Sequence, residues 1–195
     1  MPRLPPPSQD FVEVLHARRS ERLLEPVTFP EVAAVVREAL KADFVGTGSL
    51  AGRKRKRMIS AGALHPVRCV VIDRDARAVA YDDERDEFVS IEPRNASLLA
   101  VGLAKSEAVL PTANGHIISL ISDTRAPSAV YENPQSLTWR DAGAVLQTLA
   151  LVSEAFNLGF CPLGILGQEL ADAMLPEGHQ FLGVGVAVIG RRVAR

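Results

Sequence analysis

The chain of 195 residues has few aromatic residues, few cysteines and almost no net charge. Aromatic side chains make up 5% of it, and the formal net charge is −1. A shortage of rings leaves few platforms for stacking unpaired bases, and a balanced charge gives no general attraction to nucleic acid or to an acidic membrane surface. Because hydrophobic residues still reach 47%, we expect a globular domain with an aliphatic core.

Several common site signatures are also missing. No GxGxxG or GxxxxGK[ST] pattern occurs, which argues against a Rossmann dinucleotide site and a P-loop. The four histidines show no paired ligand spacing, so no metal site is expected. Cys69 and Cys161 lie in apolar stretches and are predicted to be buried free thiols. No apolar run approaches the roughly 20 residues of a membrane helix, and the first residues contain no apolar signal core, so we expect a cytoplasmic protein.

The order of sequence patterns predicts a flexible proline-rich arm over residues 1–9 and a single α+β domain over residues 10–195. Asp10 is placed to cap a helix that runs to about Arg19, and Thr28 and Glu31 form a capping box at the start of another helix. The other expected elements are a strand at 67–72, a hairpin of 78–81 and 88–91, a helix at 94–105, a strand at 116–122, a helix at 169–175 and a strand at 181–189.

Residues 44–56 are rich in glycine, serine and basic side chains, and we expect them to form a mobile loop. The basic run at 53–57 is similar to a nuclear-localisation or nucleic-acid patch. In a chain that is otherwise neutral, a solvated loop is the simpler interpretation. Specific binding of nucleic acid is therefore not expected.

The strongest helical pattern runs from about Trp139 to Leu158, and Gly159 is expected to end it. Apolar residues form one stripe and also occupy most of the opposite side. A helix with so little polar surface must be covered on all sides, either by its own domain or by a partner subunit. This pattern predicts a central helix near a subunit interface.

Two basic segments could hold a phosphate by charge-assisted hydrogen bonds. Arg18, Arg19 and Ser20 close the first helix, and Arg191 and Arg192 follow Gly190 after the last strand. Each segment has a simpler interpretation. Arginines are favourable at a helix C-terminus, and a basic tail is commonly solvated.

Two segments of small and apolar residues could approach a flat ligand. Residues 60–66 read Ser-Ala-Gly-Ala-Leu-His-Pro, where Gly62 permits strained dihedral angles and His65 is held before a proline. Residues 159–165 predict an apolar turn whose backbone N–H groups could face a ring nitrogen. A tight loop before a strand and an ordinary helix-to-strand turn are the alternatives.

Taken in order, these segments resemble the nitroreductase family, and most closely its branch of azoline (thiazoline and oxazoline) dehydrogenases. The family shows Arg-Arg-Ser near its start, a Pro-Ser-Ala-Gly-Ala-Leu-His-Pro-like loop, an Asp/Glu-Ala-Gly helix with a later Gln, a Pro-Leu/Ile-Gly turn and a final Gly plus basic residue. The matching segments here are 18–20, 60–66, 141–147 with 158–159, 162–164 and 190–191. They span nearly the whole chain.

The resemblance implies a central, mostly antiparallel sheet flanked by helices, with a long buried helix near a dimer interface. It also implies a homodimer that binds FMN between its subunits and passes a hydride between flavin N5 and an organic substrate, with NAD(P)H as a candidate electron donor. The implied contacts are Arg18, Arg19 and Arg191 at the phosphate, Ser20 at the phosphate or ribityl chain, Ser60, Ala61 and Gly62 along the ring, and Leu163 and Gly164 facing N5.

The chain departs from the family pattern at two places. Ile59 replaces the usual proline before Ser60, and Val130 replaces the lysine of a Lys-Tyr pair that looks catalytic in azoline dehydrogenases. Tyr131 and His65 are the remaining candidate catalytic side chains, since either can exchange a proton. The departures leave two hypotheses open: an oxidoreductase acting on a small molecule or a peptide, or a degenerate member that serves as a scaffold or partner protein.

Overall fold

The computed structural model describes residues 4–5, 7–111, 115–176 and 180–193. The predicted proline-rich arm therefore lies partly outside the described residues. Within the described part, the centre of the fold is a seven-stranded antiparallel sheet in the order β1-β9-β7-β4-β5-β6, with β8 also paired to β9. Its strands are β1 (Leu24–Glu25), β4 (Val67–Ile72), β5 (Ala78–Asp82), β6 (Glu87–Ile91), β7 (His116–Asp123), β8 (Leu158–Leu163) and β9 (Phe181–Arg192).

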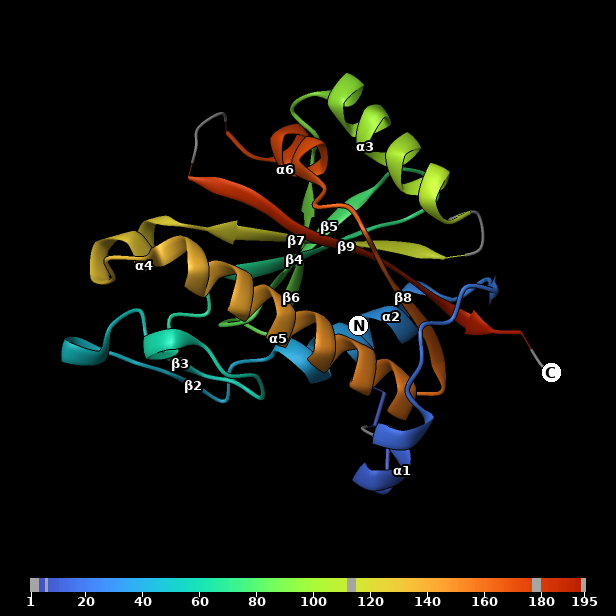
Figure 1. Cartoon of the computed structure of the whole chain (residues 1–195), viewed down its shortest axis with the longest axis horizontal. Helices are drawn as coiled ribbons and strands as arrows, with labels where there is room; N and C mark the ends of the chain where they lie inside the picture. Colours follow the sequence, from blue (N-terminus) through green and yellow to red (C-terminus); the bar gives the residue numbers. More distant parts are fainter. Residues whose placement is uncertain (1–3, 6, 112–114, 177–179, 194–195) are drawn as a thin grey trace.

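Helices cover both faces of this sheet (Figure 1). On one face lie α2 (Phe29–Leu40) and α5 (Pro134–Ala155), and on the other lie α3 (Ala96–Val109) and α6 (Gln168–Met174). An aliphatic core fills each interface, one around Val35, Ile118 and Leu149 and the other around Ile72, Leu170 and Val188. The α+β class with a mostly antiparallel sheet flanked by helices is therefore confirmed.

Local signals at the helix starts act as the sequence predicts. The Asp10 carboxylate accepts the N–H of Val12 at 2.8 Å and caps α1 (Phe11–Ala17). The N–H of Thr28 donates to the Glu31 carboxylate at 3.0 Å in the capping box of α2. However, α1 ends two residues earlier than expected and buries only Val14.

The long helix α5 is shifted from its predicted range. It begins at Pro134, which suits a first turn because proline lacks the N–H that would have no partner there, and it ends at Ala155. Asn157 adopts the left-handed conformation, with φ +57°, that was expected of Gly159. The prediction that residues 159–165 form a turn is also wrong. Residues up to Leu163 pair with β9, and Gly159 is needed there because a Cβ would clash with the Leu24 side chain.

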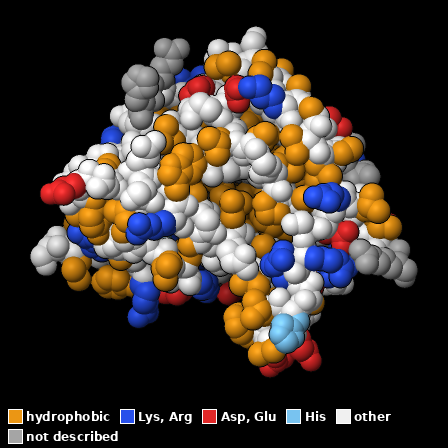
Figure 2. All heavy atoms as spheres, in the orientation of Figure 1, with side chains coloured by type: hydrophobic (Ala, Val, Ile, Leu, Met, Phe, Trp, Pro, Cys, Tyr) orange, Lys and Arg blue, Asp and Glu red, His pale blue; other side chains and the backbone are white. Residues whose placement is uncertain are grey.

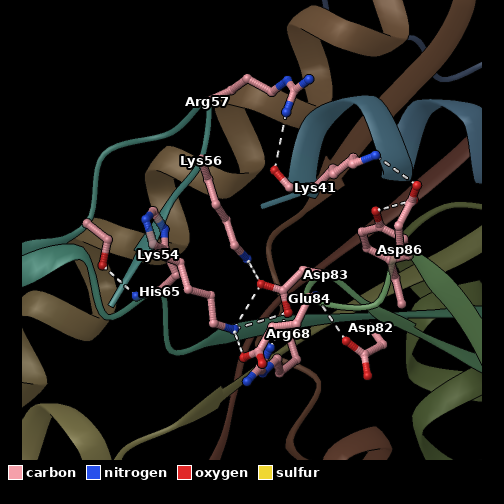
Figure 3. Close-up of polar contacts among 12 residues, drawn as sticks. Lys41, Lys54, Lys56, Arg57, His65, Arg68, Asp82, Asp83, Glu84 and Asp86 are labelled. Atoms are coloured by element: carbon pink, nitrogen blue, oxygen red, sulfur yellow. Dashed lines mark hydrogen bonds and ion pairs between the residues drawn. The ribbon is translucent and has the colours of Figure 1, made fainter. Parts of the chain in front are cut away.

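The predicted mobile loop at 44–56 is instead an ordered hairpin. Its strands, β2 (Phe44–Val45) and β3 (Lys54–Arg55), pair with each other beside the main sheet. The basic run that follows is not a free cationic patch. The side chains of Lys54 and Lys56 are only 4% and 3% exposed, and both reach the carboxylate of Asp83 (Figure 3). The prediction of a loop was based on the local composition of residues 44–56. That composition does not reveal Asp83, the partner that lies almost thirty residues further along the chain.

Asp83 anchors this hairpin to the sheet. Its carboxylate pairs with Lys54 Nζ at 2.9 Å, with Lys56 Nζ at 2.5 Å and with the Arg68 guanidinium. Burial alone would raise the pKa of the Asp83 carboxyl, but Lys56, Arg68 and Lys54 lower it to about 2. Burial lowers the pKa of Lys56 to about 8 against the attraction of Asp83. At neutral pH the carboxylate therefore stays ionised among three cations.

We expect Asp83→Asn to reduce the free energy of unfolding by about 3 kcal/mol, because it leaves buried cations without their carboxylate. Urea denaturation at pH 7 measures this loss. Glu84→Gln is the matched control, since Glu84 is 45% exposed and pairs only at the edge of the cluster, so its effect should stay within about 1 kcal/mol. The stabilisation from Asp83 is complete above its ordinary pKa of 3.8 and disappears as the pH falls towards 2. Equal losses for the two variants would contradict the assigned role.

Candidate functional site

The loop that carries Ser60, Ala61 and Gly62 is fastened to the first half of α5. Ser60 Oγ donates to the Asp141 carboxylate at 2.5 Å and accepts the backbone N–H of His65 at 2.9 Å. Burial raises the pKa of Asp141, although hydrogen bonds from Ser60 and from the backbone of Ala61 oppose that shift. Asp141 is a positioning residue that the site prediction missed. Its only sequence signal was the Asp-Ala-Gly motif of the long helix.

The backbone of this loop turns sharply. Gly62, Ala63 and His65 all have positive φ, at +58°, +57° and +45°. A left-handed conformation is unfavourable for the two residues that carry a Cβ, so the turn depends on the Ser60 hydrogen bonds that close it. Because Ala61, Gly62 and Ala63 have small or no side chains, they leave the backbone of the loop accessible along one edge.

Tyr131 and Arg53 lie against Gly62. A Cβ on Gly62 would clash with both the Arg53 guanidinium and the Tyr131 hydroxyl, and Arg53 also donates to the Gly62 carbonyl. Tyr131 caps the end of α4 (Arg125–Val130), where Val130 is 49% exposed. The structure therefore places the Arg53 guanidinium beside Tyr131. The residue before this tyrosine is Val130, where the family pair has lysine.

His65 is directed into the charge cluster. Its side chain is 7% exposed, and burial, reinforced by the charge of Lys56, lowers its pKa to about 4. The imidazole is therefore neutral at pH 7. Figure 3 shows it beside Lys54, while its backbone N–H points back to Ser60.

The Arg-Arg-Ser segment runs along strand β8. Arg18 caps α1, Arg19 is 48% exposed with Glu21 as its carboxylate partner at 3.2 Å, and Ser20 is exposed. The N–H of Glu21 then donates to the carbonyl of Phe160 at 3.1 Å. This contact joins the end of the predicted phosphate-binding segment to β8, the strand that ends at Leu163.

The other predicted cofactor residues lie on β8 and β9. Gly164 follows the buried Leu163 and is exposed, and no atom outside its immediate neighbours lies within 4 Å of the position where a Cβ would stand. Arg191 is paired with Glu31 at 2.9 Å, yet 54% of its side chain is exposed. The Gly164 backbone is thus open to a flat ligand.

Most of the predicted residues form two groups at opposite ends of α5, whereas Leu163 and Gly164 lie at the far end of β8 from Arg191, since Leu163 is opposite Val186. The Ser60 loop, Arg53 and Tyr131 gather where Asp141 lies, and α1 and β9 meet the other end, where Glu154 pairs with Arg192 (Figure 1). A helix rises ~1.5 Å per residue, so Asp141 and Glu154 are roughly 20 Å apart. A single chain therefore does not bring all the predicted residues together.

Comparisons with known proteins agree on the family. The sequence profile of the nitroreductase family matches residues 15–187. A putative nitroreductase from Ralstonia eutropha JMP134 superimposes with a TM-score of 0.69 at 15% identity, over 98% of this chain and 89% of that chain. The E. coli microcin synthetase McbBCD complex with truncated pro-MccB17 gives 0.67 at 13% identity, over 92% and 73%. A putative NADH dehydrogenase/NAD(P)H nitroreductase from Parabacteroides distasonis gives 0.56 at 15%, over 96% and 90%.

The chain belongs to the nitroreductase family, because the family profile covers most of its length. The structural likenesses, all at low identity, show that it has the fold of these oxidoreductases. A search among curated protein sequences gives no match. Among the described residues, no helix is long and apolar enough to cross a membrane, and no group of three His, Cys, Asp or Glu side chains is arranged to hold a metal ion.

We expect Ser60→Ala to lower the free energy of unfolding by about 1–3 kcal/mol, because the buried Asp141 loses a donor and the His65 N–H loses its acceptor. Thermal and urea denaturation measure the loss. Ser136→Ala is the control, since that hydroxyl bonds only to the nearby Asn133 carbonyl in an exposed position. A change of less than about 0.5 kcal/mol in both variants would show that Ser60 does not hold the loop.

Proposed function

We propose that this member of the nitroreductase family is an FMN-dependent oxidoreductase and that two copies of the chain form each site. The observation that carries the proposal is the division of the family residues into two groups, separated along α5 and each reaching the surface. A second copy in the opposite direction would bring the Ser60 loop of one chain to the Arg-Arg-Ser segment of the other. The known chemistry of the bound flavin is hydride transfer at N5.

The basic group has the charge that FMN requires. In this proposal the doubly charged phosphate lies next to three cations, Arg18, Arg19 and Arg191. Guanidinium groups form the strongest hydrogen bonds to phosphate oxygens. Arg19 pairs with Glu21, whose side chain is 12% exposed, and Arg191 pairs with Glu31, whose side chain is 26% exposed, while about half of each arginine side chain is exposed. Exchange of a solvated ion pair for a phosphate costs little, because surface ion pairs contribute little stability.

The open backbone fits a flat ring. Gly164 leaves space that any side chain would fill, and the Leu163 side chain before it is buried in the core. From the other chain, Ser60, Ala61 and Gly62 would line the ring, and Asp141 would keep that loop in place. The basic group and the open Gly164 backbone therefore fit the cofactor, and a ring could approach Gly62 once Arg53 and Tyr131 move aside.

Tyr131 and Arg53 are the groups that we assign to the substrate side. The Tyr131 hydroxyl can hold or donate a proton, and Arg53 provides a positive charge beside it where the family pair has lysine. His65 is buried and neutral, so we assign it to orienting the loop rather than to proton transfer. The proposed substrate is a small organic molecule or a peptide, in line with the likeness to the microcin synthetase complex, and NAD(P)H is the proposed electron donor.

Exposed apolar side chains support the homodimer. Figure 2 shows hydrophobic side chains gathered over α1 and across the face formed by α5 and β8. Phe11 is 65% exposed, Leu23 is 70% exposed and Trp139, on α5, is 39% exposed. Large apolar surfaces of this kind are usually covered by a partner. In this proposal a second chain covers the exposed side of α5.

A second candidate function is a partner subunit without redox activity. The specific observation in its favour is that Arg53 and Tyr131 occupy the space against Gly62, while Val130 stands in the lysine position. Purified protein that remains colourless and takes up no added FMN would support this alternative. Flavin absorbance that a reductant bleaches would support the enzyme.

We expect Arg19→Ala to weaken FMN binding by about tenfold to a hundredfold, because a charged hydrogen bond to the phosphate is lost. Quenching of FMN fluorescence measures the affinity. Arg85→Ala is the control, because Arg85 is 76% exposed and has only distant carboxylate partners, so its FMN affinity should not change. An unchanged affinity for Arg19→Ala would contradict the phosphate assignment.

Phe11→Asp should convert the dimer to monomers and abolish FMN retention, because it puts a charge into the apolar surface of α1. Sedimentation and the flavin spectrum of the same sample measure both effects. Val89→Asp is the control, since Val89 is 47% exposed on β6, at the other edge of the sheet from β1. A monomeric Phe11→Asp protein that still holds FMN would contradict a site shared by two chains.

A further inference from the structure

A largely apolar cavity lies under the helices on the face of the sheet away from α5. Its volume is about 170 Å³. Apolar residues of β4, β5, β6, β7 and β9 and the end of α6 form most of the wall: Val70, Ala80, Ile91, Ile121, Met174, Leu175 and Phe181. All seven belong to the second core or pack against it. None of the residues that line it is assigned to FMN.

The apolar wall of the cavity is part of a core, and its charged end opens towards the surface, where the Arg68 side chain is 47% exposed. Protein interiors have few spaces larger than a water molecule, and apolar cavities of roughly this size take up small hydrocarbons. Val70, Ile121 and Met174 are almost fully buried around it. Water gains no hydrogen bonds from such walls, so an apolar ligand is the occupant that the lining favours.

Charged groups stand at one end of the cavity. Arg68 and Asp123 belong to its lining. Arg125 pairs with Asp123 at 2.9 Å, and its guanidinium lies 5.4 Å from the centre of the Phe181 ring. The side chains of Arg68 and Arg125 are 47% and 62% exposed, so both can reach a ligand from the surface.

The wider network leaves this end positively charged. Arg68 also bonds Asp83, the carboxylate that Lys54 and Lys56 share, and Lys54 pairs with Glu84 as well (Figure 3). This network comprises three cations and two carboxylates, and the separate pair of Arg125 with Asp123 adds no net charge. One positive charge therefore remains without a matching carboxylate in this network. Lys54 and Lys56, from the basic run at 53–57, share Asp83 with Arg68 and so contribute positive charge near this end of the cavity.

We propose that this cavity binds a small amphiphilic anion, a short-chain aliphatic carboxylate. The hydrocarbon part lies against Val70, Ile121 and Met174, and the carboxylate lies between Arg68 and Arg125. Apolar burial supplies affinity, and the unmatched positive charge selects an anion over a neutral molecule of the same length. The site does not depend on FMN or on the dimer.

The probe is hexanoate, with hexanol and acetate to separate its apolar and charged parts. We expect hexanoate to bind and to shift the methyl NMR signals of Val70 and Ile121, with hexanol about tenfold weaker and acetate without effect on these signals. Arg125→Gln should reduce the preference for hexanoate over hexanol to about twofold.

Filling the cavity tests the location. Ala80→Leu places a larger side chain in the lining and should weaken hexanoate binding at least about tenfold. Ala100→Leu, on the exposed side of α3, is the matched control and should bind as the natural chain does. FMN uptake, measured on the same samples, should be unchanged in both, so a failure here is distinct from a failure of the proposed oxidoreductase.

Three results would overturn the proposal. Hexanoate that leaves the Val70 and Ile121 methyl signals of the natural chain unchanged would exclude the site, whether or not Ala80→Leu folds. Equal hexanoate affinity in a folded Ala80→Leu protein would place the ligand elsewhere. Equal affinity for hexanoate and hexanol would remove the role of Arg68 and Arg125.

Discussion

The length of α5 is the constraint on which the functional account depends. This one rigid helix holds the small-residue loop through Asp141 near its beginning and meets the basic end of β9 through Glu154 near its end. Helical rise separates these points by roughly 20 Å, and the backbone hydrogen bonds of the helix do not allow that distance to shrink. This separation is the reason why we propose that a phosphate and a ring contacted by both groups lie between two chains.

Buried carboxylates fix the two segments that meet near Asp141, the Ser60 loop and the β2–β3 hairpin. Asp141 holds a turn in which two residues with a Cβ adopt left-handed dihedral angles, and Asp83 holds a hairpin that would otherwise present five consecutive basic residues to solvent. In both places a charge is removed from water, and hydrogen bonds or ion pairs offset the cost of its burial. Arg53 of the same hairpin contacts Gly62 beside Tyr131, so the Asp83 cluster is physically connected to the Ser60 loop.

Much of the fold could be predicted because its signals are local. The Asp10 cap, the capping box at Thr28 and the apolar run of β4 each depend on residues close in sequence. The errors arose where distant partners decide the outcome. Lys54 and Lys56 are buried because Asp83 lies opposite them, and Gly159 belongs to a strand because β9 pairs with it. The family residues were found from their order along the chain, but Asp141 and Arg53 acquire a role only when the loop is seen folded against them.

The dependence of FMN affinity on protein concentration tests the shared site most directly. Fluorescence titrations are made at chain concentrations above and below the dimer dissociation constant, which sedimentation determines on the same preparation. If both chains contribute to each site, the apparent affinity falls as dilution separates the subunits, in step with the loss of dimer. An affinity that stays constant after the protein has become monomeric would contradict the account.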